Sequence, residues 1–258
     1  MELPNLDKIL SLKSNPKEFT TFSAQMELMS TRDIVKWALN TFDTSIALAS
    51  SFGAEDVVII DMMCDIKGKK TKVFTLDTGR LNQETYDLIE KIKERYEIEI
   101  IFLFPNKDEV EAMLKESGPN LMYKNVENRK YCCQVRKVEP LGRALLDLNC
   151  WITGLRREQS VSRSNTKKIE IDTANNDILK LNPLADWTNE QVWEYIRTNE
   201  VPYNKLHDLG YPSIGCEPCT RAVGPNDDPR SGRWWWEEST VKECGLHWVT
   251  AGKARDKK

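Results

Sequence analysis

The chain has 258 residues, of which 40% are hydrophobic and 30% charged, so it can bury a sizeable core and has the composition of a soluble globular protein. Its net charge of -3 argues against binding nucleic acid through bulk positive charge. No stretch approaches the roughly 18 to 20 apolar residues that span a bilayer, and the charges within residues 1–10 argue against a signal peptide. We therefore expect a cytoplasmic protein with no membrane or nucleic-acid partner.

Between residues 44 and 181, short apolar runs rich in β-branched residues alternate with longer amphipathic segments. This alternation is typical of βα units and predicts an α/β fold with a mainly parallel sheet flanked by helices. Strands are expected at 45–49, 72–76, 98–102, 150–153 and 178–181. Helices are expected at 56–65, 83–96, 107–116 and near 134–148.

Further helices are expected at both ends of this region. Residues 1–40 should form helices that lead into the domain, one of them starting near Thr31. Thr188 and Gln191 have the spacing of a capping box and predict a helix that ends near Thr198.

The character of the chain changes after Pro202. From residue 211, Gly, Pro, Trp, Cys and charged residues dominate without periodicity, which predicts an irregular tail that a metal or ligand must order. We therefore divide the chain into an α/β nucleotide-binding domain with N-terminal helices at 1–210 and a C-terminal tail at 211–258, which contains three of the cysteines discussed below.

Polar loops follow three of the predicted strands. In the first, Ser51 and Gly53 lead into a helix, and a glycine there lets a ligand anion approach the backbone at the helix N-terminus. The loop has neither the Gly-Lys-Ser/Thr ending of a Walker A loop nor a G-x-G-x-x-G pattern, and an ordinary βα turn is the alternative interpretation.

The other two loops fall at the same edge of a parallel sheet, where ligands bind. The second contains Asp77, Thr78, Gly79 and Arg80, and the third contains Gly154, Arg156 and Arg157. Two guanidinium groups can bind an oxyanion through paired hydrogen bonds, although a solvated arginine pair is the alternative.

Three more cations accompany these loops: Lys137, Arg230 and Arg233. Basic residues concentrated around the loops of an acidic chain indicate a small anionic ligand, of nucleotide size, rather than a polymer.

The seven cysteines are unlikely to form disulfides in a reducing compartment, and clustered cysteines there indicate metal or redox chemistry. Cys132, Cys133, Cys216 and Cys219 form two pairs that folding can bring together. Four thiolates can bind tetrahedral zinc or an iron-sulfur cluster. The directly adjacent Cys132 and Cys133 match the common ligand spacing of neither, so the sequence chemistry does not decide which metal is bound. Unrelated buried cysteines are the alternative.

Cys244 stands apart from these pairs and is the candidate nucleophile. Lys242 and His247 flank it, and nearby cations lower the pKa of a thiol and so raise the fraction of reactive thiolate. An unreactive surface thiol is the alternative. Cys64 and Cys150 lie in apolar segments and are interpreted as core residues, and His207 as structural or solvated.

Together these motifs resemble the assimilatory adenylyl-sulfate (APS) reductases, which are relatives of the phosphoadenylyl-sulfate (PAPS) reductases. The resemblance covers about residues 47–247. It is carried by Ser-Phe-Gly-Ala-Glu-Asp at 51–56, Leu-Asp-Thr-Gly-Arg at 76–80, Cys-Cys-x-x-Arg-Lys at 132–137, Gly-Leu-Arg-Arg-Glu-Gln-Ser at 154–160, Cys-x-x-Cys at 216–219 and Glu-Cys-Gly-Leu-His at 243–247.

The resemblance implies an adenine nucleotide alpha hydrolase-like fold whose three loops surround the substrate. It implies one 4Fe-4S cluster on Cys132, Cys133, Cys216 and Cys219, with zinc as second choice. It also implies phosphosulfate contacts from Lys137, Arg230 and Arg233, and we expect His247 among the substrate-binding residues.

The implied reaction reduces APS to sulfite and AMP. Cys244 attacks the sulfur of APS to form a cysteine S-sulfonate, and thioredoxin or a glutaredoxin-like dithiol then releases sulfite. We also expect a homo-oligomer, whose subunit number the sequence does not specify.

Three alternatives stay open at this stage. A PAPS reductase or dual-specificity enzyme shares the loops, although PAPS reductases generally lack the four cluster cysteines. A metal-stabilised nucleotide-binding protein without turnover is a second. An ATP-pyrophosphatase-like sulfur-transfer enzyme is disfavoured because the first loop departs from Ser-Gly-Gly-x-Asp-Ser.

Overall fold

The computed structural model describes residues 3–237, in which six strands form one sheet in the order β3-β2-β1-β4-β6-β5. The strands are β1 (Ile46–Ala49), β2 (Val73–Leu76), β3 (Ile100–Leu103), β4 (Cys150–Ile152), β5 (Ile169–Asp172) and β6 (Ile178–Leu181). All neighbours pair in parallel except β5, which is antiparallel to β6. The predicted mainly parallel α/β fold is therefore confirmed.

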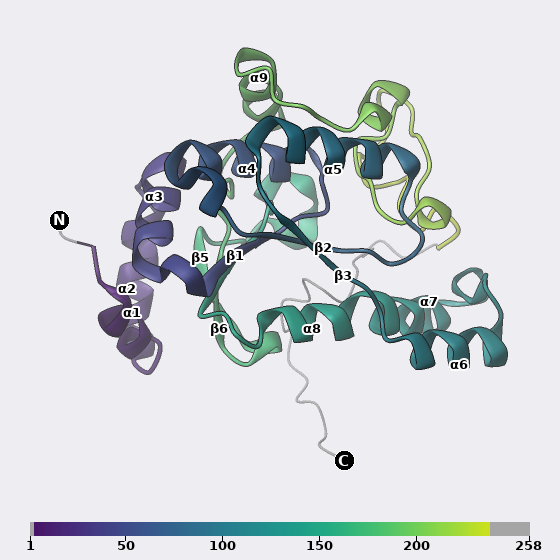
Figure 1. Cartoon of the computed structure of the whole chain (residues 1–258), viewed down its shortest axis with the longest axis horizontal. Helices are drawn as coiled ribbons and strands as arrows, with labels where there is room; N and C mark the ends of the chain where they lie inside the picture. The colour runs from purple at the N-terminus through teal and green to yellow at the C-terminus, as the bar shows by residue number, and fades with distance from the viewer. Residues whose placement is uncertain (1–2, 238–258) are drawn as a thin grey trace.

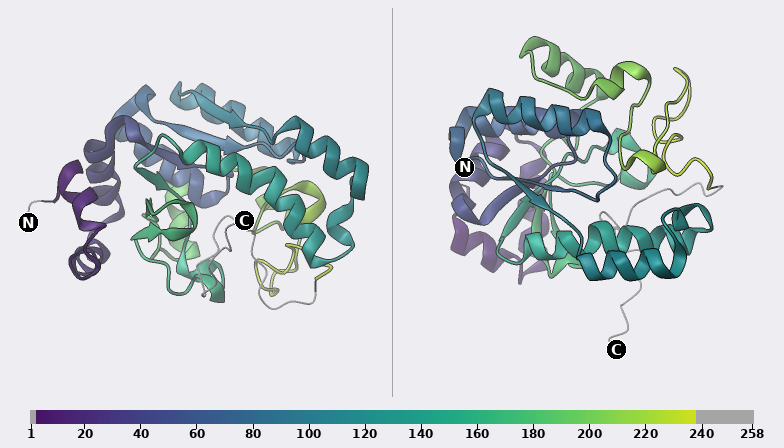
Figure 2. Two further views of the ribbon diagram at one scale, coloured as in Figure 1. Left: turned by 90° about the horizontal axis from the view of Figure 1, so that it is seen from below. Right: turned by 45° about the vertical axis from the view of Figure 1, so that its right-hand side comes forward.

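Helices cover both faces of this sheet (Figures 1 and 2). They are α1 (Leu6–Leu12), α2 (Pro16–Glu27), α3 (Thr31–Phe42), α4 (Ala54–Lys67), α5 (Gln83–Tyr96), α6 (Lys107–Ser117), α7 (Val126–Cys133), α8 (Glu139–Leu145) and α9 (Asn189–Thr198). Figure 1 shows α4 and α5 on one side of the strands and α8 on the other.

The strands bury alternate side chains in two cores, because successive side chains of a strand point to opposite faces. In β1, Ile46 and Leu48 join the larger core with α3, α4 and α5, whereas Ala47 packs against Leu141 and Leu145 of α8. Both faces of the central strands are thus apolar, which leaves the ends of the strands as the place for polar chemistry.

Side-chain caps set the helix starts that the sequence predicted. Ser30 caps α3, accepting a hydrogen bond from the backbone N–H of Asp33. At α9 the capping box is present: the Thr188 hydroxyl accepts from the Gln191 backbone at 3.2 Å, and the Gln191 side chain accepts from the Thr188 backbone at 2.8 Å. The predicted helix ending near Thr198 is confirmed.

The helix expected near 134–148 is longer and less regular than predicted. It starts as α7, widens into one π-helical segment, Gln134–Val138, and continues as α8. Pro140 explains the widening, since it has no N–H to donate and its ring clashes with the carbonyl of residue 136 in a regular α-helix.

Residues 211–237 contain little regular structure, namely a 3₁₀ turn at Glu217–Cys219 and one bridge between Thr220 and Arg233. Cys150 is fully buried and Cys64 packs against the core, as predicted. In the described part of the chain, no helix is both long and apolar enough to cross a membrane.

Candidate active site

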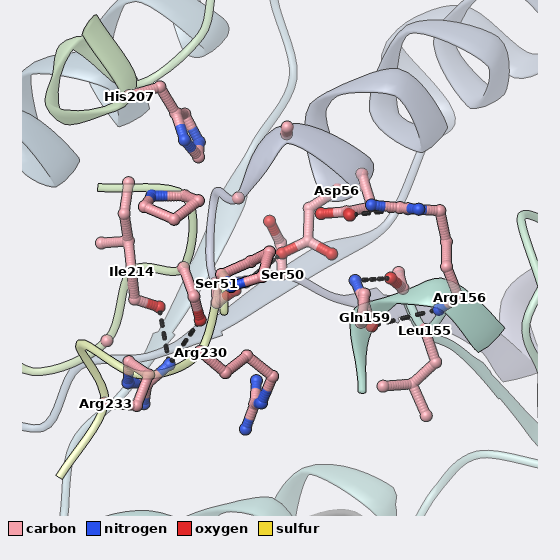
Figure 3. A pocket seen from close by; sticks show the side chains of 18 of the residues that line it. Ser50, Ser51, Asp56, Leu155, Arg156, Gln159, His207, Ile214, Arg230 and Arg233 are labelled. Atoms are coloured by element: carbon pink, nitrogen blue, oxygen red, sulfur yellow. Dashed lines mark hydrogen bonds and ion pairs between the residues drawn. The ribbon is translucent and has the colours of Figure 1, made fainter. Parts of the chain in front are cut away.

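A cavity of about 800 Å³ opens at the carboxyl ends of β1, β2 and β4. This is the edge at which an open parallel sheet binds ligands, beside the point where the strand order reverses. Its volume suits a ligand of nucleotide size. Figure 3 shows side chains from the first loop, the third loop and the segment 207–233 converging on it.

The first loop has its strained residue at Phe52 rather than at Gly53. Phe52 has a φ of 58°, in the left-handed region, and its fully buried side chain holds it there. Gly53 is extended, caps the start of α4 and lines the cavity with no atom of the protein crowding its Cβ position. The missing side chain of Gly53 therefore leaves space for a ligand, and is not needed to avoid a clash with neighbouring protein atoms.

Asp56 fixes the shape of this loop from the first turn of α4. Its Oδ2 accepts hydrogen bonds from the backbone N–H of Ser51 at 2.7 Å and from the Ser51 hydroxyl at 2.9 Å. Burial raises the pKa of Asp56 to about 6, although the two bonds from Ser51 oppose that rise. Sequence reasoning gave Asp56 no role beyond membership of the motif.

The third loop packs tightly against α4. A Cβ on Gly154 would clash with the Asp56 carboxyl and would lie 2.9 Å from Cβ of Glu55. Arg156 is buried and donates from Nε to Glu55 at 2.8 Å, so its charge is paired inside the protein. Both Gly154 and Arg156 line the cavity.

Arg157 points elsewhere and is absent from the cavity wall. Its Nη2 donates to Glu27 at 2.5 Å and its Nε donates to the Thr166 carbonyl at 2.9 Å. The two adjacent arginines therefore do not act on one anion in this structure, because each has its own carboxylate partner.

In the second loop only Thr78 of the four expected residues lines the cavity. Asp77 is buried and accepts hydrogen bonds from the Gly79 backbone at 2.8 Å and from the Tyr86 hydroxyl at 2.9 Å, so it shapes the turn. Arg80 reaches the Pro119 carbonyl and lines the neighbouring cysteine cavity instead.

Cations gather at one end of the large cavity. Lys137, Arg230 and Arg233 all line it, as expected from the sequence. Arg233 donates from Nη1 to the Ile214 carbonyl at 3.2 Å, and its Nε is buried without a hydrogen-bond partner among the described residues. Figure 3 shows Arg230 and Arg233 side by side next to Ile214. This end of the cavity suits an anionic group.

The two cysteine pairs lie around a second, small cavity. Cys132, Cys133, Cys216 and Cys219 all line it, together with the cations Arg80, Arg129, Arg136 and Lys137. Lys137 and Cys216 also line the large cavity, so one wall separates the two. Within residues 3–237, no three His, Cys, Asp or Glu side chains converge closely enough to hold a single metal ion.

The thiols of this cavity have unequal acidities. Burial raises the pKa of Cys132, and burial together with the charge of Cys216 raises that of Cys219 to about 12. Burial also acts on Cys216, but Lys137 and a 3.2 Å contact with the Thr78 hydroxyl outweigh it and lower the pKa. Bound metal would deprotonate such thiols outright.

Sequence reasoning missed several residues that line the large cavity, among them Thr75, Thr85, Gln159, Asn189, Trp193 and His207. His207 was interpreted as structural or solvated, yet its ring faces the cavity in Figure 3. No local motif marks it. Two features of the sequence could have pointed to His207. Histidine is rare in this chain, which has only two, and His207 lies just before the cavity-lining segment 210–216.

Cys244 and His247 lie outside the described residues, so their expected roles stay predictions.

Comparison with known proteins agrees with this geometry. Residues 45–222 match the Phosphoadenosine phosphosulfate reductase domain. The chain is 51% identical over 205 residues to the Adenosine 5'-phosphosulfate reductase of Burkholderia cepacia, covering 80% of this chain and 81% of that protein. It is 46% identical over 239 residues to the Adenosine 5'-phosphosulfate reductase of Pseudomonas aeruginosa strain LESB58, covering 91% and 88%.

Among solved structures, the phosphoadenylyl-sulfate (PAPS) reductase of Candida auris in its phosphate complex superposes with a TM-score of 0.69 at 31% identity, covering 81% of this chain and 98% of that one. The match to the domain spans well over half of the chain, and three relatives agree with it. The chain belongs to the phosphoadenosine phosphosulfate reductase family.

Proposed function

We propose that the protein is an oxidoreductase that reduces adenylyl sulfate (APS) to sulfite and AMP in assimilatory sulfate reduction. The shared wall of the two cavities supports this most directly, since Lys137 and Cys216 line both. An anion bound beside Lys137 lies next to the four-cysteine group. The relatives named as Adenosine 5'-phosphosulfate reductases support the same substrate.

In the proposed first step, the thiolate of Cys244 attacks the sulfur of APS. A sulfur–sulfur bond forms, the bond between that sulfur and the bridging phosphate oxygen breaks, and AMP leaves with the electron pair. Lys137, Arg230 and Arg233 would stabilise the negative charge that develops on the departing phosphate, since all three line the same cavity.

In the second step a thioredoxin-like dithiol attacks the Cys244 sulfur. Sulfite leaves, a mixed disulfide forms, and the second thiol of the reductant displaces the Cys244 thiolate. The dithiol is oxidised to a disulfide and supplies both electrons of the reduction.

We further propose that Cys132, Cys133, Cys216 and Cys219 hold one 4Fe-4S cluster. All four line one cavity, and four cations around it can balance the charge of the thiolates. Four thiolates can also bind zinc, which is the second candidate for this site. When bound, the cluster would supply an electrostatic field near Lys137 rather than electrons.

The experiment is to mix anaerobically purified protein with APS and to determine by intact mass and peptide mapping where a sulfonate group is attached. We expect one adduct, on Cys244, which a reduced dithiol removes as sulfite. An adduct on another cysteine, or none from protein that retains its iron, would refute the mechanism.

PAPS is the second candidate substrate, because the matched domain and the Candida auris relative are named for it. Single-turnover rates of adduct formation with APS and with PAPS distinguish the two. We expect APS to react faster.

A further inference from the structure

Three aromatic rings and one arginine form a patch on the surface beside the cysteine cavity. Tyr123 and Trp235 are 40% and 44% exposed. The ring centroid of Tyr123 lies 6.4 Å from that of Trp235 and 4.5 Å from that of Trp236, and the two tryptophan centroids are 5.6 Å apart. The guanidinium carbon of Arg221 lies 4.9 Å from the centroid of Trp235. We call these four residues the aromatic patch.

The aromatic patch is held against the cysteine cavity. Trp236 packs against the buried cluster that includes Cys216 and Cys219. The Tyr123 hydroxyl donates to the carbonyl of Pro218, which lines the cysteine cavity, at 2.7 Å. Rings that are already held in place lose little conformational freedom when a partner covers them, so the exposed faces of the patch are suited to binding.

The composition of the aromatic patch is typical of a protein interface. Single exposed apolar side chains are common on any protein, but a contiguous set of them marks a place of interaction. Tryptophan, tyrosine and arginine are also the residues that most often dominate the binding energy of protein interfaces. The aromatic patch therefore fits a protein partner with an apolar face.

The length of the chain limits where such a partner can meet Cys244. Glu237, which directly follows Trp236, is fastened to Arg129 through hydrogen bonds of 2.8 and 3.0 Å. Cys244 is seven residues further along, and seven extended residues span at most about 25 Å. In the proposed second step a thiol of the reductant must touch the Cys244 sulfur, so the reductant has to sit on the surface around Glu237. The aromatic patch adjoins this point.

We propose that the aromatic patch is the surface on which the protein dithiol reductant docks to release sulfite from the S-sulfonate of Cys244. This inference rests on the proposed function, because that function supplies both the S-sulfonate and the need for a dithiol. The fitting partner presents its dithiol within an apolar face that can cover Trp235 and Tyr123. The residues of the patch bind the reductant and take no part in bond breaking.

The test starts from the S-sulfonate formed with APS and measures the rate of sulfite release against the concentration of a thioredoxin. In Trp235→Ala the half-maximal concentration should rise about tenfold, whereas Trp235→Phe keeps a ring and should stay within about threefold of wild type. Arg221→Ala leaves the rings in place and should give a rise of about threefold. Phe104→Ala removes an exposed ring outside the patch and, as the matched control, should behave like wild type.

Release by dithiothreitol should proceed at the same rate in wild type and in every variant, because a small dithiol needs no docking surface. Unchanged thioredoxin dependence in Trp235→Ala would overturn this inference alone. Slower release by dithiothreitol or slower adduct formation in that variant would also overturn it, since Trp235 would then act on Cys244 itself. A changed subunit number in Trp235→Ala would make the patch an interface between copies of this chain and overturn the inference. If wild type forms no adduct with APS, the proposed function fails and this inference fails with it.

Discussion

Arg129 and Glu237 form a buried bidentate ion pair at the edge of the cysteine cavity. Nε to Oε1 is 2.8 Å and Nη2 to Oε2 is 3.0 Å, and both side chains are 3% exposed. The guanidinium carbon lies 4.6 Å from the ring centroid of Trp234, and Arg129 also interacts with Cys133. The pair therefore fastens residue 237, seven positions before Cys244, to the wall of the cysteine cavity.

Arg129→Ala should lower the free energy of unfolding by about 3 to 5 kcal/mol, since it leaves the Glu237 carboxylate buried without its partner. Denaturant unfolding of anaerobic protein measures the loss. Lys107→Ala, which removes an exposed pair with Glu111, is the control and should cost less than about 1 kcal/mol. Similar losses in both variants would mean that the buried pair is not specially stabilising.

Gly154→Ala should weaken AMP binding by more than about tenfold, because the new Cβ forces the third loop away from Glu55 and Asp56. Calorimetry measures the affinity. Gly142→Ala is the matched control, because this glycine lies within α8 with no atom near its Cβ position. That variant should keep wild-type affinity and gain about 0.5 to 1 kcal/mol of stability. Unchanged affinity in Gly154→Ala would contradict the packing argument.

Asp56 should make the protein less stable as the pH rises from about 4 to about 6. Burial raises its pKa to about 6, against about 3.9 in an unfolded chain, so the native state binds more protons across this interval. The penalty is complete above pH 6 and amounts to about 2 to 3 kcal/mol.

Asp56→Asn removes this titration. Its stability relative to wild type should improve by about that amount between pH 4 and pH 7, as measured by urea unfolding at each pH. A difference that does not change with pH would show that the carboxyl titrates normally in the native state.

Cys219→Ser should reduce the iron content to near zero, since oxygen replaces one of four thiolate ligands in the proposed cluster site. Iron analysis and visible absorbance of anaerobic protein measure this loss. AMP affinity should change little, because Cys219 does not line the large cavity. Cys64→Ser is the control and should keep its iron, because that thiol lies outside both cavities. Full iron content in Cys219→Ser would exclude Cys219 as a ligand.

The central elements could be predicted because their patterns are strong. Gln83–Tyr96 and Ile178–Leu181 lie where the sequence placed them, since one is a clear amphipathic helix and the other an apolar run. The antiparallel edge strand Ile169–Asp172 was missed, although Ile169 and Ile171 alternate with Glu170 and Asp172 in the period-two pattern of a half-buried strand.

In the candidate site, too, some features could be predicted from the sequence and others could not. Loop positions such as Ser51 and Gly154 follow from motifs, and folding brings the two cysteine pairs to one cavity. Side-chain direction does not follow from sequence: Arg156 and Arg157 are neighbours, yet they point to different partners. The position of His207 at the cavity could not be predicted from the sequence. It depends on packing against Trp193 and on the neighbouring Tyr211, and no sequence spacing connects these three residues.

The π-helical segment ahead of Pro140 separates α7 from α8, so the two parts of the long helix present their side chains in different directions. Leu141 and Leu145 lock α8 onto the sheet, whereas Cys132 and Cys133 on α7 must face the second pair of sulfurs. One residue of α-helix corresponds to about 100° of rotation, so the extra residue in the wide turn sets the angle between these two faces. A single-residue deletion within Gln134–Val138 would therefore turn the sulfurs away from their partners while the sheet stayed intact. Pro140, by causing the wide turn, thus sets the rotation of the cysteine-bearing α7 relative to α8, which packs on the sheet.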